Sequence, residues 1–61
     1  MKQKLLILED DLTLNETLVD FFEELNYEVV PVYDGEDAYS KIYESNFDLF
    51  LLDVNVPSMN G

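Results

Sequence analysis

Three runs of apolar residues along the chain predict β-strands. In residues 4–8, a lysine precedes four consecutive aliphatic side chains, which is typical of a parallel strand covered on both faces. Residues 28–32 form a short β-branched run. Pro31 favours the edge of a sheet for this run, because proline cannot donate a hydrogen bond to a neighbouring strand. Residues 47–52 form the third apolar run, and we expect a strand at each of the three places.

The segment between the first two runs has the pattern of an amphipathic helix. Thr13, followed three residues later by Glu16, predicts a capping box at the start of this helix. Asn26 tolerates the left-handed backbone conformation that ends many helices, so we expect the helix to end there. Between these positions, apolar residues recur at spacings typical of one helix face: Leu14, Leu18, Phe21, Phe22 and Leu25.

A second helix is predicted between the second and third apolar runs. We interpret Asp34–Gly35 as the start of this helix and not as part of a site, because aspartate is a preferred residue at helix N-termini. Asn46 is the expected end. The apolar positions of this segment are Ala38, Tyr39, Ile42 and Tyr43.

The alternation of strands and helices predicts an α/β fold with three layers and a parallel sheet. Each crossover between parallel strands should be right-handed. The first and third strands are the most apolar, so we place them side by side and the second strand outside the first, which gives the strand order 2-1-3. We expect the four phenylalanines to lie in the core: Phe21, Phe22, Phe47 and Phe50.

Length and composition limit the classes of protein that the chain can represent. With 61 residues it forms at most one domain, and the absence of cysteine and histidine excludes disulfides, thiolate metal sites and a histidine general base. Fourteen acidic residues against three lysines give a net charge of −11, which excludes a nucleic-acid-binding surface on this segment. The N-terminus leads into only four consecutive apolar residues, too few for a signal peptide or membrane span. We expect a soluble, cytoplasmic protein.

Two of the predicted strands end in carboxylates. Glu9, Asp10 and Asp11 follow the first strand, and Asp53 follows the third. In parallel α/β sheets, ligands bind at the edge formed by the carboxyl ends of the strands. Carboxylates delivered there by two neighbouring strands predict a site for a divalent cation, and an aspartate beside such a cation suggests phosphoryl chemistry.

These motifs together resemble the first half of a response-regulator receiver domain, a truncated flavodoxin-like fold. The resemblance covers essentially the whole of residues 1–61. It rests on the acidic pair after the first strand, on the Asp-x-x-x-Pro-x-x-x-Gly pattern from Asp53 through Pro57 to Gly61, and on the distance between them. Each motif alone is weak, and their agreement makes the resemblance specific.

The resemblance implies a role for each matching residue. Asp53 matches the aspartate that accepts a phosphoryl group from a sensor histidine kinase, so the domain is a signalling module and not an enzyme in the usual sense. Asp10 and Glu9 match the acidic pair that holds Mg²⁺, Asp10 directly and Glu9 through water. The main-chain carbonyl of Asn55 matches a further metal ligand. A Glu-Asp pair weakly favours the regulators whose DNA-binding output domain is a winged helix, and these control transcription.

Other interpretations stay open at this point. Asp10 and Asp11 also suit the positive N-terminal end of the first helix, and Asn55 also suits a turn. An aspartate-nucleophile phosphohydrolase of the haloacid-dehalogenase type would carry a second Asp and a Thr where this chain has Asn55 and Pro57. A third interpretation is a half-domain that is not phosphorylated and acts in interaction or assembly.

The second half of a receiver has no counterpart in these 61 residues. The Ser or Thr after the fourth strand and the Lys after the fifth, which bind the phosphoryl group in the family, can be assigned to no residue here. We expect the third strand to form an open edge, with Leu49, Phe50 and Leu51 exposed to water. We also expect the chain to form a homodimer, and DNA to be bound only through an output domain outside this sequence.

Overall fold

The structure, a computed structural model, describes residues 2–52 and contains five elements in the predicted order. They are β1 (Lys4–Leu8), α1 (Leu12–Glu24), β2 (Glu28–Val32), α2 (Gly35–Glu44) and β3 (Leu49–Leu52). The first two strands have the predicted bounds. Among the described residues, no helix is long and apolar enough to cross a membrane.

The three strands form one parallel sheet with the predicted order β2-β1-β3. In the central strand, Leu6 pairs with Val30 on one side and with Phe50 on the other. β1 can occupy the centre because its side chains are apolar on both faces of the sheet. Pro31 lies in β2, at an edge of the sheet, where its missing N–H interrupts no ladder.

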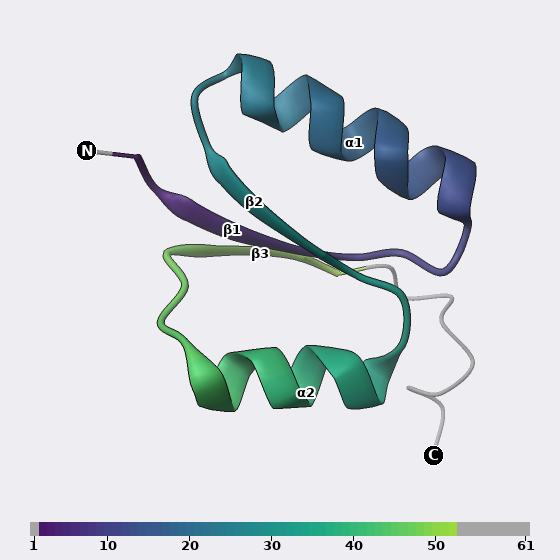
Figure 1. The fold of residues 1–61 in the computed structure, drawn as a ribbon, viewed down its shortest axis with the longest axis vertical. Helices are drawn as coiled ribbons and strands as arrows, with labels where there is room; N and C mark the ends of the chain where they lie inside the picture. Colours follow the sequence, from purple (N-terminus) through teal and green to yellow (C-terminus); the bar gives the residue numbers. More distant parts are fainter. Residues whose placement is uncertain (1, 53–61) are drawn as a thin grey trace.

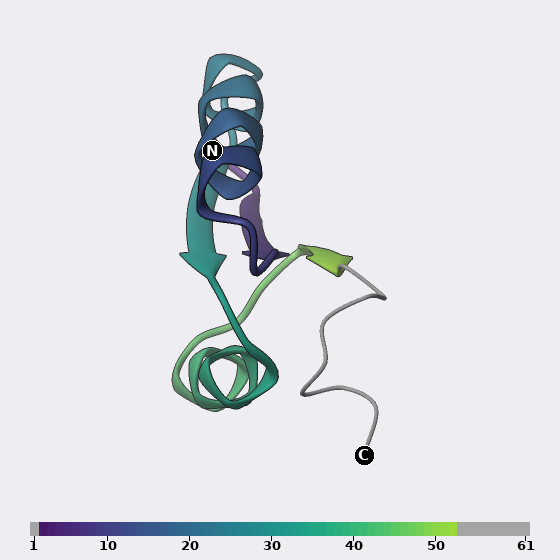
Figure 2. The same ribbon diagram turned by 90° about the vertical axis from the view of Figure 1, so that its right-hand side faces the viewer.

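The two helices cover opposite faces of the sheet, which gives three layers (Figures 1 and 2). Leu6 and Leu8 of β1 form a core cluster with Val32 of β2 and Ala38 of α2. Burial of each large aliphatic side chain contributes about 1.5–3 kcal/mol. The core is therefore centred on β1, the strand with the most continuous apolar sequence.

The start of α1 differs from the prediction. The N-cap is Asp11 and not Thr13: the Asp11 carboxylate accepts a hydrogen bond of 3.0 Å from the Leu14 N–H. Thr13 lies inside the first turn, where its carbonyl accepts a hydrogen bond from the Thr17 hydroxyl. Aspartate is at least as good an N-cap as threonine. Capping at Asp11 therefore extends the helix by two residues without loss of cap stability.

The end of α1 confirms the role predicted for Asn26. This residue has a φ of 72°, and it is the one non-glycine residue with positive φ in the described part of the chain. The Tyr27 N–H donates to the Phe22 carbonyl at 3.1 Å, and the Asn26 N–H donates to the Glu23 carbonyl at 3.0 Å. This is a Schellman motif, and the ring contact between Phe22 and Tyr27 is the apolar contact that accompanies it.

The start of α2 is as predicted. The Asp34 carboxylate accepts a hydrogen bond of 2.9 Å from the Asp37 N–H, and the helix begins at Gly35. The helix ends at Glu44 with Ser45 as its C-cap, slightly before the predicted end at Asn46.

β3 begins two residues later than predicted, because Asp48 forms a junction with β1. The Asp48 N–H donates to the Lys4 carbonyl, and the Lys4 N–H donates to an Asp48 carboxylate oxygen, both at 2.8 Å. The preceding Phe47 packs against the core cluster, and the Lys4 ammonium lies 5.2 Å from the centre of its ring. The Lys4 N–H is thus bound by the Asp48 side chain, and β3 begins at Leu49.

Two of the four phenylalanines do not lie in the core, contrary to the prediction. Phe21 is 55% exposed and Phe50 is 48% exposed, whereas Phe22 and Phe47 are half-buried. Within residues 2–52, the backbones of both helices lie close to β1 and β2, and neither lies close to β3. All four residues of β3 are therefore exposed, which confirms the expectation for Leu49–Leu51.

Candidate functional site

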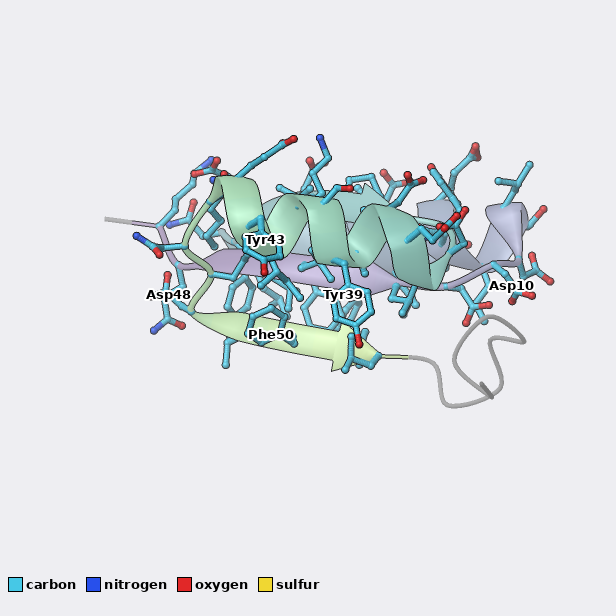
Figure 3. The ribbon with its side chains drawn as sticks, turned by 90° about the horizontal axis from the view of Figure 1, so that it is seen from below. Asp10, Tyr39, Tyr43, Asp48 and Phe50 are labelled. Atoms are coloured by element: carbon cyan, nitrogen blue, oxygen red, sulfur yellow. The ribbon has the colours of Figure 1, made fainter. Side chains whose placement is uncertain are left out.

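The carboxyl ends of β1 and β3 meet at one edge of the sheet, as the strand order predicts. Leu8, the last residue of β1, pairs with Leu52, the last residue of β3. Figure 3 shows Asp10 at the edge toward which β3 points and Asp48 at the opposite edge. The acidic residues that follow β1 (Glu9, Asp10 and Asp11) therefore lie near Leu52, the residue that precedes Asp53 in the sequence.

The other predicted site residues lie outside the described residues: Asp53, Asn55, Pro57 and Gly61. The predicted convergence of Glu9, Asp10 and Asp53 stays a prediction.

Glu9 is buried, and both polar groups of its backbone are hydrogen-bonded. Its N–H donates to the Val32 carbonyl at 3.1 Å, and its carbonyl accepts from the Asn15 side-chain amide at 3.0 Å. One carboxylate oxygen of Glu9 accepts a hydrogen bond of 3.0 Å from the Asp11 N–H. This bond orders the turn between β1 and α1, and the buried acid is thereby fixed at the end of the strand.

The two aspartates that follow Glu9 have different surroundings. The Asp11 carboxylate caps α1, so its structural interpretation is confirmed. Asp10 is exposed, and within residues 2–52 no hydrogen bond or ion pair involves its carboxylate. The backbone of the turn is therefore held in place, and the carboxylate of Asp10 is exposed to solvent.

Asn15 was not among the predicted site residues, and it is completely buried in the first turns of α1. Its side-chain amide donates to the carbonyls of Glu9 and Val32, each at 3.0 Å. A signal was present in the sequence. Asn15 lies three residues before Leu18 and seven before Phe22, on the apolar face of the helix, where an amide needs a specific partner.

The donors at this edge fit a magnesium ion. Mg²⁺ binds oxygen ligands, commonly one or two carboxylates together with water and phosphate. Glu9 directly follows β1, and Asp10 lies at the end of the sheet toward which β3 points (Figure 3). Residues 2–52 alone contain no group of three acidic, histidine or cysteine side chains arranged to hold a metal. A complete site therefore needs a donor from outside the described residues.

Comparison with known proteins establishes the family. The model of the response regulator receiver domain matches residues 5–61, and the chain belongs to this family. Residues 1–61 are 45% identical to part of the transcriptional regulatory protein CrdR of Helicobacter pylori, and the match covers all of this chain and 29% of that protein. The regulatory protein VanRB of Enterococcus faecalis is 39% identical over 61 residues, again over all of this chain and over 28% of its own length.

The transcriptional regulatory protein CiaR of Streptococcus pneumoniae is 38% identical over 58 residues, which cover 95% of this chain and 25% of that protein. The chain thus spans about a quarter of the length of these relatives. No solved structure matches the chain significantly.

Proposed function

We propose that the chain is the phospho-acceptor part of a two-component response regulator. In this proposal Asp53 accepts a phosphoryl group from a sensor histidine kinase. The observation that carries it is the pairing of Leu8 with Leu52, which ends β1 and β3 at one edge, directly before the acidic cluster and Asp53. The membership of the receiver family supports the same role.

In the proposed site, Mg²⁺ would be held by the carboxylates of Asp10 and Asp53, by the main-chain carbonyl of Asn55 and, through water, by the carboxylate of Glu9. Asp10 is exposed at this edge, so its carboxylate is suited to bind the metal directly. Glu9 is buried, and one of its oxygens already accepts the Asp11 N–H, which suits a contact through water. When bound, Mg²⁺ neutralises charge on the transferring phosphoryl oxygens and orients donor and acceptor.

The reaction makes modest demands on the chain itself. A carboxylate oxygen of Asp53 forms the new bond to phosphorus while the bond from phosphorus to the histidine nitrogen of the donor breaks. The product is an acyl phosphate, a recognised form of covalent attachment to aspartate. A carboxylate nucleophile carries no proton that must be removed during the attack, so the step requires no general base, and the chain contains no histidine that would act as one.

The names of the relatives support the proposed output. CrdR and CiaR are described as transcriptional regulatory proteins, which supports transcription control by the full gene product. The Glu-Asp pair favours a winged-helix output domain, and DNA would be bound by that domain, since this segment carries a charge of −11. The proposal includes a sensor kinase as partner, a homodimer, and a cytoplasmic location.

Phosphorylation of matched variants tests the proposed function. The gene product that contains residues 1–61 is incubated with a small acyl-phosphate donor and Mg²⁺, and the added phosphate is measured by mass spectrometry. We expect Asp53→Asn to abolish labelling. Asp48→Asn is the control, because this residue directly precedes β3, at the end opposite to Leu52, and its carboxylate accepts a hydrogen bond from the Lys4 N–H. Undiminished labelling of Asp53→Asn would rule out the assignment.

A further inference from the structure

We propose that Asn15 is a positioning residue for the acidic edge. Its side-chain amide donates hydrogen bonds to the carbonyls of Glu9 and Val32. These bonds set the positions at which the carboxylates of Glu9 and Asp10 would bind a magnesium ion. The inference rests on the proposed function and adds a residue of α1 that is not itself a ligand.

The amide of Asn15 joins three elements at one point. Its two hydrogens go to carbonyls at the ends of different strands, Glu9 after β1 and Val32 in β2, each at 3.0 Å. The Asn15 N–H donates to the Asp11 carbonyl at 2.8 Å, in the first turn of α1. The start of the helix is therefore tied to both strands through a single residue.

This arrangement fixes the backbone immediately before Asp10. The Glu9 N–H is bonded to the Val32 carbonyl, and the Glu9 carbonyl is bonded to Asn15, so both polar groups of that residue's backbone are engaged. The Asp11 N–H is bonded to the Glu9 carboxylate. Asp10 thus lies between two residues with fixed backbones, and only its side chain remains to adjust to a cation.

The chemistry of this position favours asparagine over an apolar residue. Asn15 is completely buried, and among the described residues its side-chain carbonyl oxygen has no hydrogen-bond partner, which costs stability. Leucine would avoid that cost but would remove the donor to the Glu9 carbonyl. Aspartate has the same shape, but its carboxylate would face two carbonyl oxygens. The amide orientation is set by these same acceptors, because the reversed amide would place three oxygens together.

The test compares magnesium binding and local backbone order in Asn15→Leu, Asn15→Ser and wild type, in the gene product that contains this chain. Asn15→Leu removes both donors, and Asn15→Ser keeps one hydroxyl donor. Groups that support metal ligands typically contribute about 10–100-fold to affinity, so we expect Mg²⁺ alone to bind at least about tenfold more weakly to Asn15→Leu. Asn15→Ser should fall between that variant and wild type.

Amide hydrogen exchange without Mg²⁺ is the second measurement. The N–H groups of Glu9 and Asp11 should exchange slowly in wild type and faster in both variants, whereas the centre of β1 should change less. Val29→Ala is the matched control for a general loss of stability. It lies in the same sheet but pairs with Leu5, near the opposite end of β1 from Glu9, and its Mg²⁺ affinity should stay at the wild-type value.

The outcomes separate the inference from the proposed function. Wild-type Mg²⁺ affinity in Asn15→Ser or Asn15→Leu, with wild type itself binding Mg²⁺, would overturn the positioning role alone. An equal loss of affinity in Val29→Ala would also overturn it, because the effect would then be general. Absence of Mg²⁺ binding in wild type would overturn the proposed function and the inference together. If Asn15→Leu does not fold, Asn15→Ser and the exchange rates in wild type decide the question.

Discussion

Two adjacent aspartates should respond in opposite ways to the same substitution. Asp11→Ala removes the N-cap of α1, whose carboxylate accepts the Leu14 N–H at 3.0 Å. Loss of an aspartate N-cap typically costs about 1 kcal/mol of stability, and this loss should appear with or without Mg²⁺. Asp10→Ala removes an exposed carboxylate without a bonded partner in residues 2–52, so the free energy of unfolding without metal should change by less than about 0.5 kcal/mol.

Magnesium reverses the order of the two effects. At a Mg²⁺ concentration one hundred times the dissociation constant, binding to the native state alone stabilises it by about 2.7 kcal/mol. We expect Asp11→Ala to keep most of this gain and Asp10→Ala to lose most of it. Asp10→Ala should therefore be the less stable variant in saturating Mg²⁺ and the more stable one in its absence.

Urea unfolding of the gene product that contains this chain, with and without Mg²⁺, measures all four free energies. Because the two variants differ by one position and remove the same charge, the net charge cancels from the comparison. Retention of the full Mg²⁺ gain in Asp10→Ala would refute the assignment of Asp10 as a ligand. An equal loss of the gain in both variants would refute the division of roles between the two aspartates.

Two further predictions concern the end of α1 and the exposed strand. Asn26 has a φ of 72°, so Asn26→Gly should be neutral or slightly stabilising, whereas Asn26→Ala should lower the free energy of unfolding by about 1 kcal/mol. Thermal unfolding measures both variants, and equal melting temperatures would contradict this account of the helix end. A peptide of residues 1–61 should self-associate in sedimentation experiments, more strongly as salt or Mg²⁺ screens its charge of −11, and Phe50→Lys should weaken the association. A monodisperse wild-type monomer at every salt concentration would show that the chain does not self-associate through β3.

Local patterns along the sequence were sufficient for most of the fold. The apolar run at Leu5–Leu8 predicted a central strand, since only a strand covered on both faces accommodates apolar residues at every position. Pro31 predicted the edge position of β2, and Asn26 predicted the end of α1. Each of these follows from the backbone chemistry of a few neighbouring residues, which is why it could be found without a structure.

The failures of prediction lie where contacts between distant segments decide the outcome. Whether Asp11 or Thr13 caps α1 depends on how the turn after β1 is bonded, and Glu9 orders that turn through the Asp11 N–H. The later start of β3 depends on the bonds between Asp48 and Lys4, which are 44 residues apart. The exposure of Phe50 likewise depends on which strands the helices cover.

For the candidate site, the sequence by itself determined the identity of the acidic residues and the strands that deliver them. Glu9 and Asp10 follow the first strand and Asp53 follows the third, and parallel strands end at a common edge for geometric reasons. Only the tertiary structure distinguished the surroundings of the three acids. Glu9 is buried and accepts a hydrogen bond from the Asp11 N–H, Asp10 is exposed, and the Asp11 carboxylate caps α1. The tertiary structure alone revealed Asn15, because the need of a buried amide for partners can be judged only once the carbonyls of Glu9 and Val32 are in place beside it.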